Sequence, residues 1–445
     1  MSATRTLGWL GIVRLGLVQT ALGSIVVLTT STLNRVMVVE LALPALLPGV
    51  LVALHYAVQV ARPRFGYGSD TGRRRTPWIV GGITVLGLGG ILAAVATALM
   101  SMQPLGGIAL AVIAFLLIGA GVGASGTCLL VLLASGVAPE RRAAAASITW
   151  IMMIAGFAVT AGLVGAFLDP FSLTRLVAIT SIVAACALVL TLLALRGLED
   201  SIAGTEGAPV QAAGERPAAP GFVAALVSVL REDHTRRFGV FVFISMLAYS
   251  AQDLILEPFA GAVFGLTPGE STQLGGIQHT GVLIGMLFVA ILGQRMRDQR
   301  SRMLGHAVVG GCAGSGLLLG ALSVAGYVGA EWPLSASVFA LGIANGCFAV
   351  AAIGSMMALV SQGHKQRSGT RMGVWGAAQA VAFAVGGIIG TGAVDLVRVL
   401  TGSVLHAYSV VFFAQAVLFG IAAFIATRLW HRRGTPMDSV AVEAG

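Results

Sequence analysis

Charged side chains are what this sequence most lacks. Asp, Glu, Lys and Arg make up only 10% of its 445 residues, whereas 57% are hydrophobic and the mean hydropathy is +0.91. So little charge cannot solvate a globule of this size, and lipid must surround most of the chain. Inside a bilayer the backbone must be satisfied internally, which leaves helices or a closed barrel. Long unbroken apolar runs exclude the barrel, whose strands alternate in polarity.

Cysteine pairs and enzyme motifs are missing as well. The four cysteines lie inside apolar segments without a paired spacing, so the sequence indicates neither a disulfide framework nor a zinc site. It contains no Walker loop, nucleophile elbow, HExxH helix or Asp-rich motif. We therefore predict that the protein is not an enzyme and has no catalytic residue, resident metal or obligatory cofactor.

What the sequence does have is a series of apolar runs, each long enough for a membrane-spanning helix. Twelve runs are separated by polar breaks, which predicts an all-α membrane protein with twelve transmembrane helices. The predicted spans are 9–31, 42–61, 77–100, 107–136, 143–168, 174–195, 238–263, 273–293, 304–328, 333–360, 372–397 and 404–429.

The basic residues predict how these helices are oriented. The net charge of +9 does not form a solvated basic face, which argues against nucleic acid as a partner. The 27 Lys and Arg residues instead fall almost entirely between alternate apolar runs, as the positive-inside rule requires. The exceptions are Arg35, Arg175 and Arg398 on the opposite side, and Arg14 within the first helix. Both termini are therefore predicted to be cytoplasmic.

A stretch of different composition divides the chain. Residues 197–235 are rich in Glu, Gly, Ala and Pro and are predicted to be a cytoplasmic linker, whose GFVAALVSVLRE segment forms an interfacial helix. Six-helix bundles are predicted for residues 1–196 and 236–430, followed by a cytoplasmic tail, 431–445.

A weak internal repeat supports this division. Arg142 precedes Trp150 by eight residues, as Arg367 precedes Trp375, in the fifth and eleventh spans. Asp169 and Asp395 then close these two helices. This pattern is typical of two parallel six-helix repeats.

The loop after the second span carries the first family resemblance. Its sequence, Gly66-Tyr67-Gly68-Ser69-Asp70-Thr71-Gly72-Arg73-Arg74-Arg75, resembles the cytoplasmic loop of the major facilitator superfamily, which implies the major facilitator fold. The resemblance assigns Asp70 to capping a neighbouring helix and Arg73 or Arg74 to bridging the two halves, with Gly66 at the start of the motif. The spacing after Asp70 is one residue shorter than in that family. The alternative is a basic loop that faces anionic lipid.

Two polar strings narrow the family. Residues 32–41, TLNRVMVVEL, followed by Pro44, and residues 249–261, YSAQDLILEPFAG, resemble the PucC and LhaA proteins of photosynthetic bacteria. This resemblance covers nearly the whole chain apart from the linker and tail. It implies an inner-membrane protein that assembles light-harvesting complexes, with light-harvesting or reaction-centre polypeptides and membrane lipids as partners, and bacteriochlorophyll as bound cargo.

The same strings contain a cluster of polar residues at the periplasmic side. Asp253 and Glu257 are four residues apart and share one helix face, and carboxylates within a membrane are functional candidates by default. Pro258 predicts a kink or helix end. Arg35 and Glu40 lie at the same depth in the other half, and we predict that Arg35 pairs with Asp253 or Glu257 and gates the periplasmic side. The alternative is a structural ion pair. Asn34 and Gln252 complete the predicted cluster.

Two histidines within predicted spans, His55 and His279, are candidate ligands for the magnesium of bacteriochlorophyll, because neutral imidazole is a common axial ligand. The alternative for each is a hydrogen-bonded packing residue, and oxygen ligands or water could hold the magnesium instead.

Two other functions stay open at this stage. The fold alone would suit a secondary transporter of a small solute, which the acidic pair could couple to protons. A membrane enzyme is the third possibility, because some PucC relatives carry the label of a bacteriochlorophyll synthase chain. A prenyl-type synthase, however, would need Asp-rich motifs to bind magnesium diphosphate.

Overall fold

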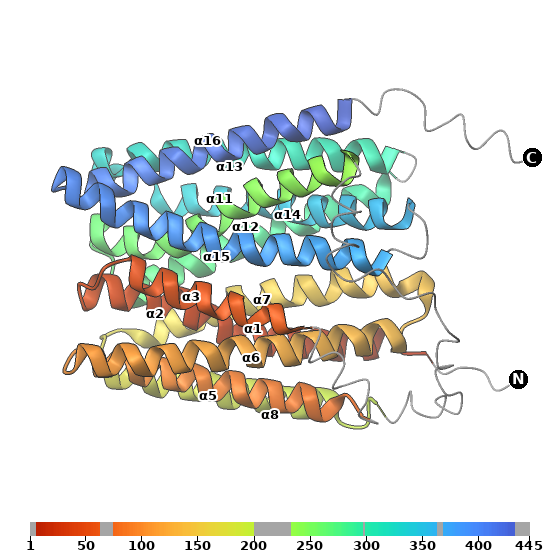
Figure 1. The fold of residues 1–445 in the computed structure, drawn as a ribbon, viewed down its shortest axis with the longest axis horizontal. Helices are drawn as coiled ribbons and strands as arrows, with labels where there is room; N and C mark the ends of the chain where they lie inside the picture. The colour runs from red at the N-terminus through yellow and green to blue at the C-terminus, as the bar shows by residue number, and fades with distance from the viewer. Residues whose placement is uncertain (1–5, 63–73, 200–232, 297–298, 363–367, 432–445) are drawn as a thin grey trace, which may run out of the picture.

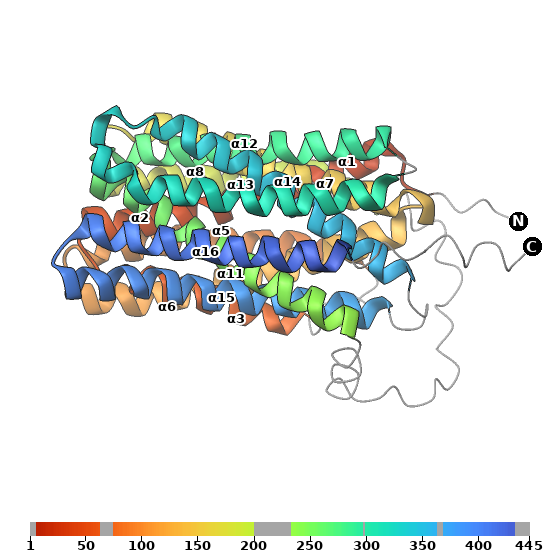
Figure 2. The ribbon, with the colours of Figure 1, turned by 90° about the horizontal axis from the view of Figure 1, so that it is seen from above.

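The computed structural model describes residues 6–62, 74–199, 233–296, 299–362 and 368–431. Within them the protein is all-helical, and its long helices run side by side along one direction (Figures 1 and 2). The helix that begins the described chain and the one that ends it reach the same end of the bundle (Figure 1). We call that the terminal end, and the opposite one the distal end.

The first six predicted spans correspond to the first group of helices. These are α1 (Trp9–Val27), η1 (Leu28–Thr32), α2 (Leu33–Arg35), η2 (Val36–Glu40), α3 (Leu46–Val58), η3 (Gln59–Ala61), α5 (Thr76–Met100), α6 (Pro104–Gly136), η4 (Pro139–Arg141), α7 (Arg142–Leu168) and α8 (Leu173–Leu195). The α1, η1, α2 and η2 segments form one continuous span, Trp9–Glu40.

The second six spans follow the same order. They are α11 (Asp233–Phe264), α12 (Pro268–Arg295), α13 (Arg300–Val328), η6 (Gly329–Glu331), α14 (Leu334–Gln362), α15 (Ser368–Thr401) and α16 (Val404–His431). Among the described residues, eleven helices are long and apolar enough to cross a membrane, and the shorter apolar helix Leu46–Ala61 corresponds to the remaining predicted span. The predicted all-helical fold is confirmed.

The helix starts have clear local causes. Proline occupies the first turn of α5, α6 and α12, where its missing N–H would be unsatisfied anyway. Thr267 caps α12 in a capping box with Glu270, and the Ser172 hydroxyl accepts a hydrogen bond from the Arg175 N–H at the start of α8. These caps fix the short distal turns that reverse the chain.

Two seams join the halves of the bundle. α3 packs on α15, and α7 packs on α12, while most other contacts lie within α1–α8 or within α11–α16. In sequence order these are spans two with eleven and five with eight, so one seam is the counterpart of the other in a parallel repeat. The predicted domain bounds stay a prediction, and the linker from residue 200 to 232 lies outside the described residues.

Glycine lets neighbouring helices approach closely at Gly119 and Gly386. A Cβ on Gly119 would lie 2.6 Å from the His55 carbonyl oxygen, and one on Gly386 would lie 2.5 Å from that of Leu247. Larger residues would force α6 away from α3, and α15 away from α11.

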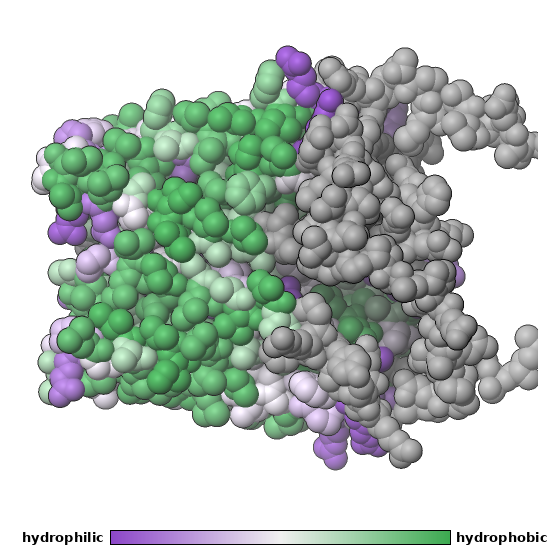
Figure 3. Space-filling model, in the orientation of Figure 1, coloured by the Kyte–Doolittle hydropathy of each residue, from purple (hydrophilic) through white to green (hydrophobic). Residues whose placement is uncertain are grey.

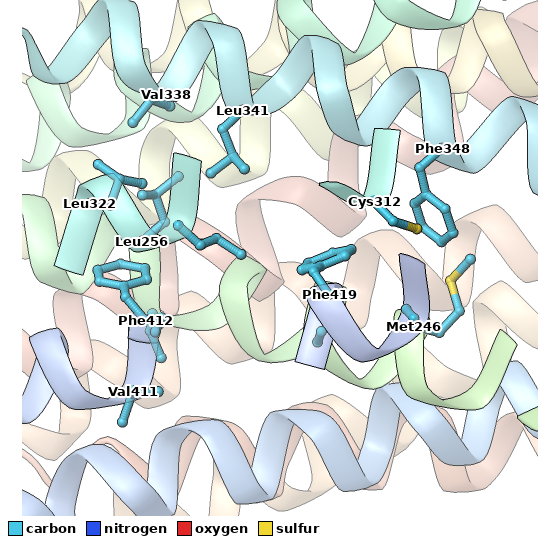
Figure 4. Close-up of a cluster of buried hydrophobic side chains, with 14 of the residues drawn as sticks. Met246, Leu256, Cys312, Leu322, Val338, Leu341, Phe348, Val411, Phe412 and Phe419 are labelled. Atoms are coloured by element: carbon cyan, nitrogen blue, oxygen red, sulfur yellow. The ribbon is translucent and has the colours of Figure 1, made fainter. Parts of the chain in front are cut away.

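The core of the second half is an apolar cluster built from α11, α13, α14 and α16. Its labelled members include Met246, Cys312, Phe348, Phe412 and Phe419, whose side chains converge between the helices (Figure 4). On the outside, hydrophobic residues cover most of the described surface in Figure 3, with hydrophilic residues near the ends. An apolar belt of this kind suits a lipid environment.

Candidate functional site

The first span does not end at residue 31 as predicted, because it continues to Glu40 through two π-helical segments. η1 and η2 lie on either side of Asn34 and Arg35, which are 1% and 2% exposed. π-helical turns are rare and are frequently found at functional sites. The polar residues look like a helix end in the sequence, but the helix continues because α11 and Glu40 provide their hydrogen-bond partners.

Asn34 binds α11 at the point where Pro258 interrupts its hydrogen bonds. Pro258 has no N–H, so the carbonyl of Leu254, four residues earlier, loses its usual helical donor. Asn34 Nδ2 donates to that carbonyl oxygen at 2.6 Å. The proline therefore marks a docking point between the halves, and α11 continues through it to Phe264.

Arg35 also reaches across to the second half, although not to the predicted partners. Its ion pair is with Glu40 of its own span, and its Nη2 donates to the Leu266 carbonyl oxygen at 2.6 Å. A Cβ on Gly261 would lie 2.9 Å from this guanidinium. The predicted direct pairing of Arg35 with Asp253 or Glu257 is wrong, because its guanidinium is paired with Glu40 and donates to the Leu266 carbonyl in the turn after α11.

Glu257 lies between the two halves without an ion-pair partner in the described part of the chain. Its side chain is 2% exposed, it interacts with Ser31, and its Oε2 has no hydrogen-bond partner. A Cβ on Gly275 of α12 would lie 2.5 Å from Oε1. The carboxyl group is thus enclosed by α11, α12 and η1, with the charge of Arg35 within electrostatic range.

Asp253 has a different environment one turn earlier. Its side chain is partly exposed, and it lies within electrostatic range of Tyr56, Tyr249 and His279. Within the described residues it makes no hydrogen bond and no ion pair. The two carboxylates therefore share a helix face as predicted, but only Asp253 is partly exposed.

Gln252 belongs to a separate network that the sequence analysis missed. Its Oε1 accepts a hydrogen bond from Asn345 Nδ2 at 3.3 Å, and Asn345 Oδ1 accepts one from Ser315 Oγ at 2.8 Å. All three side chains are buried, on α11, α14 and α13. Single polar residues inside apolar spans were the only sequence signal for this network.

His55 is engaged by its own helix. The ring Nε2 lies 2.9 Å from Gln59 Nε2, whose amide oxygen accepts a hydrogen bond from Arg62. Because the Gln59 amide nitrogen can only donate, His55 Nε2 is the acceptor, and Nδ1 is buried without a partner. The side chain is 1% exposed, so this arrangement fits the packing alternative better than pigment ligation.

His279 is also fixed by a local bond. Its Nδ1 donates to the Gly275 carbonyl oxygen at 2.7 Å, and its ring stands edge-on to Phe157 of α7 at a centroid distance of 5.1 Å. At 4% exposure the ring is part of the α7–α12 seam. A bacteriochlorin could reach Nε2 only if this seam separated.

Two aspartates connect the halves at the distal end. Asp169, at the end of α7, accepts hydrogen bonds from Thr267 Oγ1 at 2.5 Å and from the Gly269 N–H at 3.2 Å, at the start of α12. Asp395, in α15, accepts from the backbone N–H groups of Ala45 at 3.0 Å and of Leu46 at 2.7 Å, at the start of α3.

We call these interactions the distal latches. Each places a carboxylate at the positive N-terminal end of a helix in the other half. The sequence analysis noted Asp169 and Asp395 as ends of equivalent helices but did not foresee their role, because the partners are backbone groups.

Most of the predicted loop motif lies outside the described residues, including Gly66, Asp70 and Arg73. Arg74 is described and exposed. Elsewhere in the described ranges, no three His, Cys, Asp or Glu residues come together in a group that could hold a metal ion.

Comparisons with known proteins agree on family and fold. A family model described as PUCC protein matches residues 32–434. The "Bacteriochlorophyll synthase 44.5 kDa chain" of Rhodobacter capsulatus is 52% identical over 430 residues, covering 96% of this chain and 97% of that protein. The "Protein PucC" of the same organism is 28% identical, covering 95% of this chain and 93% of its own length.

Solved structures support the fold alone. The nucleoside transporter NupG superposes with a TM-score of 0.67 at 14% identity, covering 94% of this chain and all of the transporter. A peptide transporter of the POT family gives a TM-score of 0.68, also at 14% identity, covering 97% of this chain and 98% of the transporter. The major facilitator fold predicted from the sequence is confirmed.

Proposed function

The chain belongs to the PUCC family, and on that basis we propose that it is a membrane assembly factor for bacterial light-harvesting complexes, which binds bacteriochlorophyll and delivers it to antenna polypeptides. The observation that carries this proposal is the 52% identity, over almost the whole of both chains, to a relative named for bacteriochlorophyll. Light-harvesting or reaction-centre polypeptides would then be its protein partners, within the bacterial inner membrane.

The scarcity of buried charged side chains inside the bundle favours an apolar cargo over a polar one. Among the described side chains that are buried, the charged ones are Arg35 and Glu257, and the remaining polar ones are mostly neutral. A site for a polar solute would need more groups that exchange hydrogen bonds with water for hydrogen bonds with the ligand. A tetrapyrrole needs extended apolar contact and a few polar anchors.

We propose binding and delivery rather than catalysis, although the R. capsulatus relative is named a synthase chain. A prenyl-type synthase holds its diphosphate substrate through magnesium ions bound by several carboxylates. Here the two interior carboxylates lie in different environments, because Glu257 is enclosed whereas Asp253 is partly exposed. Turnover of chlorophyllide with a prenyl diphosphate would overturn this view.

A second candidate is a proton-coupled transporter of a small solute. It is favoured by Glu257, a buried carboxyl group without an ion-pair partner in the described residues, between two halves with a transporter fold. Such a group could gain and lose a proton as the halves move.

One purification separates the two candidates. The full chain is produced in a photosynthetic host, purified in mild detergent, and its near-infrared absorption is compared with that of an unrelated membrane protein purified in parallel. We expect bacteriochlorophyll to copurify stoichiometrically. A colourless protein, together with uptake of a solute by proteoliposomes under a proton gradient, would favour the transporter.

A further inference from the structure

An apolar groove of about 330 Å³ lies between α5 and α6, which pack against each other along the bundle (Figure 1). Its floor is where the two helices approach most closely, because a Cβ on Gly82 would lie 2.6 Å from the Ser125 nitrogen, and one on Gly121 would lie 2.5 Å from the Leu86 nitrogen. The remaining lining residues are Pro77, Trp78, Gly81 and Val85 of α5, and Ala120 and Ala124 of α6.

The groove is confined to the terminal half of these helices. From Pro77 to Val85 it is about 12 Å long, which is less than half the width of a bilayer core. Leu88 and Leu116, which are 58% and 39% exposed, continue the same helix faces with bulky side chains and end the groove toward the distal side. A second transmembrane helix would need close approach across the whole bilayer, whereas one acyl chain of a single leaflet matches a short, closed groove.

Basic residues lie at the terminal mouth of the groove. Arg74 and Arg75 directly precede α5; Arg74 is exposed, and Arg75 Nη1 donates to Ser135 Oγ of α6 at 2.7 Å. Glu199 accepts a hydrogen bond from the Arg75 N–H, so its carboxylate offsets one of the two positive charges. These three residues therefore leave a net positive charge at the mouth, where Trp78 is the kind of aromatic residue that favours the headgroup region.

We propose that this groove binds an anionic phospholipid from the leaflet on the terminal side, with one acyl chain along Gly81 and Val85 and the phosphate beside Arg74. The apolar walls stabilise the chain by burying its methylene groups, and the arginine favours an anionic headgroup over a zwitterionic one. This inference goes beyond the proposed function and does not depend on it, because the groove lies within the first half and apart from the polar residues between the halves.

Trp78 provides the signal for the test, because it lines the groove. The full-length protein is reconstituted in phosphatidylcholine vesicles that contain a small fraction of phospholipid with brominated acyl chains, which quench tryptophan on contact. The contribution of Trp78 is the difference between wild-type protein and Trp78→Phe. We expect brominated phosphatidylglycerol to quench Trp78 at an about fivefold lower mole fraction than brominated phosphatidylcholine, since one arginine near the membrane surface favours anionic lipid by that factor. Equal mole fractions would overturn the proposal.

Three further variants locate the lipid. Arg74→Gln should remove the preference for phosphatidylglycerol. Gly81→Leu should fill the groove and reduce quenching of Trp78 by both lipids, since a Cβ on this exposed glycine would meet no other atom within 4 Å. Gly310→Leu is the matched control, because Gly310 of α13 is equally exposed and has the same free space, and it should change neither result.

Two outcomes of these measurements would also contradict the lipid site. If Gly310→Leu reduces quenching as much as Gly81→Leu, the loss does not come from the groove and the proposal fails. If neither lipid quenches Trp78 in wild-type protein, a protein surface such as a transmembrane helix of a second copy covers the groove, and the proposal fails as well.

Discussion

At the scale of single residues, the most informative pair is Asn34 and Pro258. A proline within a helix leaves one carbonyl without a donor, and a buried polar group without a partner costs about 1–3 kcal/mol. The side chain of Asn34 supplies the missing donor from the other half of the molecule. Asn34, a polar residue within an apolar span, and Pro258, a proline within a helix, are thus complementary in three dimensions.

We therefore expect Asn34→Ala to destabilise the protein by about 1–3 kcal/mol, because the Leu254 carbonyl would be left buried and unsatisfied. Pro258→Ala restores a backbone N–H to the same carbonyl, so Asn34→Ala should cost clearly less in that background. Thermal unfolding in detergent, monitored for the four proteins of the cycle, measures the difference. Equal losses in both backgrounds would contradict the proposed complementarity.

Glu199 offers a second test at this scale, outside the spans. Burial alone would raise the pKa of its carboxyl group, but the backbone N–H groups of Arg75 and Thr76 donate to it at 2.5 and 2.9 Å, and the Arg75 charge also favours the anion. The net effect is a pKa below the usual value of 4.5. The carboxylate thereby caps the start of α5.

A lowered pKa in the folded state means that this group stabilises the protein above pH 4.5 and that the contribution is lost as the pH falls further. We expect wild-type protein to exceed Glu199→Gln in stability at pH 7, and the difference to shrink as the pH falls below 4.5. Midpoints of thermal unfolding at several pH values measure it. A difference that stays constant with pH would show that the charge of Glu199 is not involved.

The sequence was enough to predict which residues form the candidate site, but not which groups those residues bind. The two polar strings contain Asn34, Arg35, Asp253 and Glu257, and the structure brings the spans that carry them together. The contact of Arg35 with the Leu266 carbonyl could not be predicted, because a main-chain carbonyl leaves no trace in side-chain chemistry. The prediction of His55 as a pigment ligand failed to account for its surroundings for a related reason. A shared helix face predicts the contact between His55 and Gln59, but it does not show which ring nitrogen is left free.

At the scale of elements, the distal latches connect the ends of α7 and α15 to the starts of α12 and α3. A carboxylate at a helix N-terminus contributes about 1–2 kcal/mol through hydrogen bonds and the helix dipole. The two latches lie on different seams, so their contributions should be nearly additive. Together they favour the state in which the distal end is closed.

We predict that Asp169→Asn and Asp395→Asn each raise the ratio of open to closed distal ends about fivefold to thirtyfold, and that the double variant raises it further. Spin labels at Gln103 and Glu331, exposed distal positions on the two halves, report the separation in a background without the four native cysteines. Electron–electron resonance then measures the distance distribution. A double variant with the wild-type distribution would exclude a role for the latches in closure.

Helix bounds could be predicted only where the polar breaks in the sequence coincide with the ends of helices in the structure. Most spans were recovered within a few residues, because their polar breaks coincide with capped turns such as the one at Thr267. The first span was predicted nine residues too short, since Asn34 and Arg35 resemble a helix end when their partners in the second half are unknown. The π-helical segments have no sequence signal of their own.

At the scale of the whole molecule, composition was enough to predict the architecture. Twelve apolar runs and a repeat of matching positions pointed to two six-helix bundles, and the structure has the corresponding order of helices and two equivalent seams. The repeat could not show that α3 meets α15 and α7 meets α12, because contacts between halves depend on small residues that are common throughout an apolar sequence.

Orientation in the membrane is the last property that this architecture predicts. α13 runs from the terminal end to the distal end, so its two flanks must lie on opposite sides of the bilayer. By the positive-inside rule, the basic residues near Arg295 and Arg300 predict that the terminal end is cytoplasmic. We expect a green fluorescent protein fused after Gln299 to fluoresce, and alkaline phosphatase fused after Glu331 to be active, because each reporter works on only one side. The reversed pattern would place the distal latches in the cytoplasm, and closure of that end would then shield the interior from the cytoplasm.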